Sequence, residues 1–108
     1  MNLPTEIFGE VIVVHTPEEL GADQCDEFEA YVQTLERHNI VLDVDNTEVL
    51  GSRGLEALLN VQDALRDAEG DLKVAATNPT NRKIFEITRL DQQLEVFHSV
   101  IDAVKSFR

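Results

Sequence analysis

The stretch that decides the fold runs from Ile40 to Leu55 and reads IVLDVDNTEVLGSRGL. It opens with an almost continuous apolar run, Ile40 to Val44, which is typical of a strand buried on both faces of a sheet. A polar loop follows, and the string Gly51-Ser52-Arg53-Gly54 then precedes leucines at helical spacing. This one segment therefore predicts a buried strand, a loop and the start of an amphipathic helix.

On the N-terminal side, the sequence predicts two short strands followed by a helix. The strands are Thr5 to Phe8 and Val11 to His15, separated by a glycine-containing turn. From Asp23 the apolar residues follow helical spacing, and we expect the last turn of this helix at His38, with Asn39 as its cap. Its inner face is expected to carry Cys25, Phe28, Val32 and Leu35.

On the C-terminal side, helices and strands continue to alternate. The helix expected after Ser52 is stopped by Gly70, and a strand is expected from Leu72 to Ala76. A third helix opens at Asn78-Pro79, and a last strand, Leu94 to Phe97, leads into a C-terminal helix. The inward-facing residues expected in these helices are Leu55, Leu58, Leu59, Gln62 and Leu65, then Ile84, Phe85 and Thr88, and finally Val100, Ile101, Val104 and Phe107.

The order of these elements, β β α β α β α β α, predicts the fold class. Strands that alternate with helices indicate an α/β domain in which helices cover one sheet, and right-handed crossovers make the later strands mostly parallel. The 108 residues contain no internal repeat and no linker-like stretch. We therefore expect a single domain over residues 1–108.

Composition limits the classes of function. The net charge of −12 repels phosphate backbones and anionic lipids, so nucleic acid and membrane surfaces are disfavoured as partners. No stretch has the apolar length of a membrane span, and residues 1–8 lack the pattern of a signal peptide. The single cysteine, Cys25, can form no internal disulfide, and the histidines have no metal-ligand spacing: His15, His38 and His98. A cytoplasmic domain without a metal or cofactor is expected.

The most enzyme-like string is Asp43 to Thr47, which matches the Asp-x-Asp-x-Thr signature of haloacid-dehalogenase-type phosphatases. In that chemistry Asp43 would attack phosphorus and Asp45 would handle the proton, with Mg²⁺ between carboxylates. No acidic pair follows Thr77 to complete such a metal site. We therefore expect that the chain is not an enzyme, and we interpret the two aspartates as strand-end and loop residues.

Ser52 stands where the N-cap of the central helix is expected, and serine is a common cap. A phosphate on Ser52 would also meet the helix N-terminus and add up to about two negative charges. Such a modification would change a docking surface without unfolding the domain. The residues alone leave both roles open, a structural cap and a switch.

Three stretches resemble one known family. Residues 40–55 resemble the core of STAS domains and, more narrowly, the anti-sigma factor antagonists of bacteria, whose pattern runs from an aliphatic strand ending in Asp to Asp-Ser-x-Gly-Leu at a helix start. Residues 78–90 resemble the Pro-x-x-x-x-x-Phe helix of this family, and residues 94–103 resemble its last strand and helix. The resemblance implies the STAS fold, a mixed sheet of four or five strands with helices largely on one side.

The resemblance also implies a role in signal transduction and transcription regulation. Such an antagonist binds an anti-sigma factor that is also an ATP-binding serine kinase, and phosphorylation of the serine at the helix start releases it. By position that serine is Ser52. The residues expected to contact the partner flank it: Glu19, Gly21, Asp23, Gly51, Arg53, Gly54 and Glu56.

The sequence departs from the family pattern next to this serine. Gly51 replaces the usual Asp, Arg53 replaces the usual Ser or Thr, and Gly21 stands where an acidic residue is usual. These departures favour an alternative, in which the domain is a non-phosphorylated accessory subunit of a membrane transporter or of a stress-signalling complex. At its position beside Ser52, Arg53 would neutralise a phosphate on that serine or contact a different partner.

Overall fold

The computed structural model describes residues 1–107. Two strands of two residues each, β3 and β5, were not predicted from the sequence. The elements are, in chain order, β1 (Thr5–Phe8), β2 (Val11–His15), β3 (Glu19–Leu20), α1 (Cys25–Gln33), β4 (Asn39–Asp43), β5 (Val49–Leu50), α2 (Ser52–Asp67), β6 (Asp71–Ala75), α3 (Pro79–Ile87), the 3-10 helix η1 (Leu90–Gln92), β7 (Glu95–Phe97) and α4 (Val100–Lys105).

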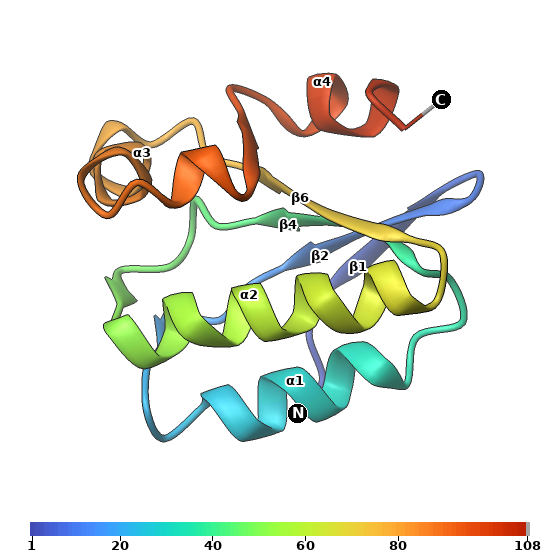
Figure 1. Ribbon diagram of the computed structural model, residues 1–108, viewed down its shortest axis with the longest axis horizontal. Coiled ribbons are helices and arrows are strands. Elements are labelled where there is room, and N and C mark those ends of the chain that lie inside the picture. The colour runs from blue at the N-terminus through green and yellow to red at the C-terminus, as the bar shows by residue number, and fades with distance from the viewer. Residues whose placement is uncertain (108) are drawn as a thin grey trace.

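The main sheet has five strands in the order β1-β2-β4-β6-β7. β1 is antiparallel to β2, and each later pair of neighbours is parallel. The predicted α/β class and the predicted mixed sheet are therefore confirmed. Because β2, β4, β6 and β7 run in the same direction, their carboxyl ends meet at one edge of the sheet, where the connecting loops gather (Figure 1).

The two faces of the sheet carry separate cores, because successive side chains of a strand point to opposite faces. Ile12 and Leu42 face the larger core, which α1, α2 and the Phe85 side chain of α3 complete. Val13 and Val41 face the smaller core, which α4 covers. Figure 1 shows α1 and α2 side by side on one face and α4 on the other. Most of the helical cover is thus on one side, as predicted.

The smaller core contains a buried lysine that the sequence analysis did not identify. Lys73 of β6 is 8% exposed, and its Nζ lies 2.8 Å from Ser106 Oγ. The same ammonium lies 4.5 Å from the centre of the Phe107 ring and 5.8 Å from that of Phe97. A cation with a hydroxyl partner and two aromatic faces is well accommodated away from water, so Lys73 attaches α4 to the sheet.

The predicted end of α1 is wrong by several residues. The helix ends at Gln33, and the Thr34 hydroxyl donates to the Tyr31 carbonyl across its last turn. Asn39 is not a cap, because it is the first residue of β4 and pairs with Val11. Residues 34–38 form the connection from the end of α1 to the start of β4. The spacing of apolar residues within the helix could not predict how long this connection has to be.

Two predicted inward-facing residues point outward. Thr88 lies beyond α3 and is exposed, whereas Asn81 is buried in its place. Ile101 is 62% exposed, and Ala103 is the buried residue of α4. Both helices are short and bury few residues. In α3 the polar Asn81 is buried in place of Thr88, and in α4 the small Ala103 is buried in place of Ile101, whereas apolar periodicity favoured the other residue in each case.

Candidate functional site

The Ser52 region is assembled by the pairing of β3 with β5. These strands are parallel, with Leu20 opposite Leu50, and the Gly51 N–H donates to the Leu20 carbonyl over 3.1 Å. This pairing brings the loop before α1 beside the start of α2, although some thirty residues separate them in the chain. The two segments predicted to form one surface therefore lie together.

Gly54 is required for this approach. A Cβ atom at Gly54 would lie 2.0 Å from the Leu20 carbonyl oxygen, far inside any real contact. At Gly51, by contrast, the nearest atom to an added Cβ would be 3.7 Å away, which is ordinary van der Waals contact. Gly54 is consequently a buried residue whose lack of a side chain permits the close approach of α2 to β3. The glycine at position 51 is not required by space.

Ser52 is not the N-cap that the sequence predicted. It is the first residue of α2, and Gly51, in an extended conformation, occupies the cap position without a side chain to serve as acceptor. Ser52 itself is exposed to solvent. The structural role assigned to its hydroxyl is therefore absent, and the side chain is accessible at the positive end of the helix dipole.

Arg53 links the start of α2 to the start of α1. Its Nη2 lies 3.4 Å from Sγ of Cys25, the first residue of α1. This contact with Cys25, followed by the carboxylates of Glu56 and Asp26, raises the pKa of the Arg53 guanidinium. Arg53 therefore remains a cation at the centre of an otherwise acidic surface. Cys25 is 1% exposed, as expected for a core residue.

The remaining predicted docking residues surround this position. Gly21 is half-buried at the end of β3, and its N–H donates to the Gln24 side-chain oxygen over 3.1 Å. Val49 is an exposed apolar residue, 51% exposed, that the sequence analysis missed. We call the exposed residues here the Ser52 surface, which comprises Glu19, Asp23, Val49, Ser52, Arg53 and Glu56.

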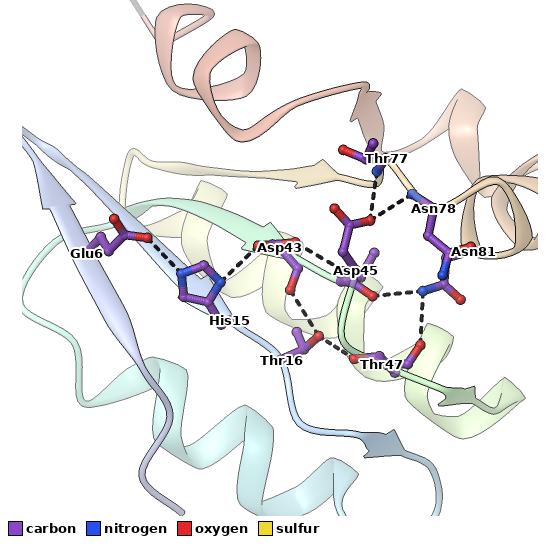
Figure 2. Close-up of polar contacts among 10 residues, drawn as sticks. Glu6, His15, Thr16, Asp43, Asp45, Thr47, Thr77, Asn78 and Asn81 are labelled. Atoms are coloured by element: carbon purple, nitrogen blue, oxygen red, sulfur yellow. Dashed lines mark hydrogen bonds and ion pairs between the residues drawn. The ribbon is translucent and has the colours of Figure 1, made fainter.

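A second polar cluster lies at the carboxyl edge of the main sheet, and Figure 2 shows its contacts. Asp45 accepts the backbone N–H groups of Thr77 and Asn78 over 2.7 and 2.9 Å. Asp43 accepts the Asp45 N–H through one carboxylate oxygen and contacts the His15 ring through the other. Both aspartates thus connect loops, which is more than the solvated role that we predicted for them.

Asn81 is the buried centre of this cluster. It is 2% exposed, and its amide nitrogen donates to the carbonyls of Val44 and Thr47 over 2.8 and 3.0 Å. Thr47 is also buried, and its hydroxyl contacts the Thr16 hydroxyl (Figure 2). The Thr47 hydroxyl also donates to the Pro17 carbonyl. The side chain of Asn81 therefore provides hydrogen-bond donors for two backbone carbonyls in the loop that links β4 to β5. It thereby helps to fix the segment that leads into the Ser52 surface.

His15 at the end of β2 joins two carboxylates. Its ring nitrogens lie 2.9 Å from Asp43 and 2.8 Å from Glu6, so only the doubly protonated ring donates to both. Partial burial lowers the pKa of His15, but the hydrogen bonds and charges of Glu6 and Asp43 outweigh burial and raise that pKa above its usual value. The predicted strand-end position is correct, and the role in linking β1 to β4 was not foreseen.

Neither cluster has the composition of a metal site. Within residues 1–107, no three His, Cys, Asp or Glu side chains come together in a way that could hold a metal ion. Asp43 and Asp45 are engaged with His15 and with loop amides, as described above. The phosphatase alternative therefore finds no support in the geometry of these residues. Of the helices in the described part of the chain, none is long and apolar enough to cross a membrane.

Comparison with known proteins identifies the class. The model of the STAS domain family matches residues 2–103, and the chain belongs to this family. Residues 43–47, which carry the haloacid-dehalogenase signature, lie within the part of the chain that this family model matches. No curated protein sequence matches the chain at a significant level.

Solved structures show the same fold. An anti-sigma factor antagonist from Mycobacterium paratuberculosis shares 24% identity, with 97% of this chain and 92% of that chain covered and a TM-score of 0.83. The phosphorylated form of the Bacillus cell fate determinant SpoIIAA shares 19%, with 99% and 100% covered and a TM-score of 0.70. A sulfate transporter family protein from Wolinella succinogenes shares 13%, with 94% and 87% covered and a TM-score of 0.79.

Proposed function

We propose that this STAS domain is a regulatory, cytoplasmic protein-binding module of the anti-sigma factor antagonist type. Its partner would be an anti-sigma factor that is also an ATP-binding serine kinase, and Ser52 would be the residue that this kinase phosphorylates. The observation that carries the proposal is the place of Ser52: exposed at the first turn of α2, next to the loop after β3.

The structure of this surface favours a switch that leaves the fold intact. Because Gly51 and not Ser52 is the N-cap, modification of the Ser52 hydroxyl removes no capping interaction. A phosphate would add negative charge to a surface that already carries Glu19, Asp23 and Glu56. A partner attracted to the acidic surface through basic residues would still meet a changed shape and charge at its centre. Phosphorylation of Ser52 would therefore change the affinity for the partner more than the free energy of unfolding of the domain.

Arg53 is expected to decide how strong this switch is. It stands next to Ser52 and now contacts Cys25. A phosphate on Ser52 would compete for the guanidinium, because phosphate is a stronger hydrogen-bond acceptor than a thiol. The phosphorylated form would then exchange an α1–α2 contact for a local ion pair, which reshapes the same surface that the partner contacts.

The test is to purify the chain with its partners from its native host and measure the mass of the Ser52 peptide in the same preparation. We expect an ATP-binding serine kinase to co-purify and the phosphorylated form to be absent from the complex. In a titration with that kinase, Ser52→Asp should weaken binding by at least roughly tenfold, since it places a charge at the helix start. Thr80→Asp is the matched control, because Thr80 is exposed in the first turn of α3.

The second candidate is a non-phosphorylated STAS accessory subunit of a transporter or stress-signalling complex. The similarity to the Wolinella sulfate transporter family protein and the departures at Gly51 and Arg53 favour it. In this case Ser52→Ala and Ser52→Asp should bind the partner equally, and the Ser52 peptide should carry no phosphate. Equal binding of the two variants would reject the phosphorylation switch.

A further inference from the structure

The outer edge of β1 is open. β1 is the end strand of the sheet, and within residues 1–107 its neighbour is β2 alone. In a hairpin with a two-residue loop, the closing pair is a hydrogen-bonded one, so Phe8 and Glu6 direct their backbone groups toward β2. The bond from the His15 N–H to the Pro4 carbonyl follows the same alternation. The backbone N–H and C=O groups of Thr5 and Ile7 therefore point away from β2, toward the open edge of the sheet.

The side chains of this edge are unusually apolar for an exposed strand. All four residues of β1 are exposed, and Ile7 and Phe8 are 61% and 44% exposed. The one charged residue of the strand, Glu6, is paired with His15 over 2.8 Å. Soluble proteins usually protect such edges with unpaired charges, prolines or a covering element, and β1 has none of these along residues 5–8.

We propose that β1 pairs with β1 of a second copy of this chain, antiparallel about a twofold axis at Ile7. This register sets Ile7 directly opposite the partner's Ile7 and Glu6 opposite the partner's Phe8. The neighbouring register, centred on Glu6, would set two like charges opposite one another, which is destabilising. Pairing about a twofold axis at Ile7 therefore forms backbone hydrogen bonds and covers Ile7 with the partner's Ile7, while Phe8 lies beside the aliphatic part of the partner's Glu6.

Charge explains why a second copy fits this edge. The chain carries a net charge of −12, so most ways of joining two copies bring acidic surfaces together. Along β1 the exposed side chains are Thr5, Ile7 and Phe8 together with Glu6, whose charge His15 offsets only in part because it also contacts Asp43. Pairing along β1 therefore brings one carboxylate of the strand per copy to the contact. The Ser52 surface remains free, because the β1–β2 loop and the start of α2 lie at opposite ends of the molecule (Figure 1).

Sedimentation equilibrium on the intact chain tests the pairing over a concentration series that reaches about 1 mM, where weak contacts become populated. We expect a reversible monomer–dimer equilibrium that Ile7→Lys weakens by at least roughly tenfold, since it adds an unpaired charge to the edge. Ile87→Lys is the matched control and should leave the equilibrium unchanged, because Ile87 is 71% exposed but lies on α3. A wild-type monomer throughout, or an unaffected Ile7→Lys dimer, overturns the proposal.

Cysteine cross-linking tests the register and does not depend on the stability of the lysine variant. Directly opposite residues have Cα atoms about 5.5 Å apart, within disulfide range, so Ile7→Cys should form a covalent dimer on mild oxidation. Thr5→Cys should not, because the two copies of residue 5 would lie about 13 Å apart along the strands. The wild type controls for Cys25, which is buried. Cross-linking of Thr5→Cys in preference to Ile7→Cys contradicts the axis.

Discussion

Two polar clusters lie on either side of the loop from β4 to α2, and they differ in burial. The cluster around Asn81 and Thr47 is buried and connects loops through backbone carbonyls and amides. The Ser52 surface is exposed, and within residues 1–107 its one long-range side-chain hydrogen bond is that of Arg53 with Cys25. Polar residues of the buried cluster therefore stabilise the fold, whereas those of the Ser52 surface remain available for a partner. The reason is that an unsatisfied polar group is costly only where water cannot reach it.

The largest effect is expected for Asn81→Leu. The leucine has a similar size but leaves the Val44 and Thr47 carbonyls without their donor in a buried site. We expect a loss of about 3 kcal/mol in the free energy of unfolding, measured by denaturant titration. Ser52→Ala, at an exposed position, should change the same quantity by less than about 0.5 kcal/mol. Similar losses in the two variants would contradict the distinction between the clusters.

Gly54→Ala tests the packing that holds the Ser52 surface in place. Its methyl group would lie 2.0 Å from the Leu20 carbonyl oxygen, so the β3–β5 pair or the start of α2 has to move. We expect a net loss of about 2 kcal/mol in the free energy of unfolding, together with weaker partner binding. Gly51→Ala has space for its methyl group and should cost no more than about 1 kcal/mol, through the poorer cap. Equal losses of unfolding free energy in Gly54→Ala and Gly51→Ala would show that α2 can move away from the Leu20 carbonyl at little cost.

His15 should make the stability of the fold depend on pH through its contacts at the polar cluster that contains Asp43. Its pKa is raised in the folded chain, so its contacts with Glu6 and Asp43 stabilise the fold fully below the unfolded pKa of about 6.5 and are lost as pH rises through the folded pKa. His15→Gln should therefore be less stable than the wild type at pH 5.5, by under about 1 kcal/mol. The difference should shrink as pH rises past that point.

Thermal unfolding of both proteins across pH measures this difference. His98→Gln is the control, since no salt bridge to a carboxylate forms at His98 within residues 1–107. A gap between the wild type and His15→Gln that widens with rising pH would show that the neutral imidazole is the stabilising form.

The smallest effect is expected at the cap of α2. Gly51→Asp supplies the missing side-chain acceptor at the N-cap and restores the acidic residue usual at this position in anti-sigma factor antagonists. Space permits the change, and we expect a gain of about 0.3 kcal/mol in the free energy of unfolding. Under the function proposed above, the same variant should also be phosphorylated faster at Ser52 by the proposed partner kinase, if Gly51 limits that reaction. A loss of stability would mean that the backbone at Gly51 is not a true cap position.

Much of the architecture was predictable because it is encoded locally. The hairpin of β1 and β2 has the predicted bounds, and α3 opens at the predicted Asn78-Pro79. α2 begins one residue earlier than predicted, with Gly51 and not Ser52 as its N-cap. Alternating and helical hydrophobic periods specify which face of each element is buried, and glycine and proline mark the ends. Five of the six residues of the Ser52 surface were named from the sequence through the family resemblance, and Val49 was missed.

The errors arose where one element depends on another. The residues of β3 and β5 are too few to show a period, so their pairing could not be predicted. The end of α1 depends on the position of β4, and the burial of Asn81 depends on the carbonyls of Val44 and Thr47. Lys73 looks like a surface residue until Phe97 and Phe107 come together around it.

The sequence by itself determined the class of fold, the family and the position of Ser52 at a helix start, because periodicity and a local motif carry that information. Only the tertiary structure decided that Gly51 is the cap and Ser52 is free, that Gly54 packs against Leu20, and that the edge of β1 is open. These are relations between segments distant in the chain. They are set by the space and the unpaired backbone groups that remain once the sheet has formed.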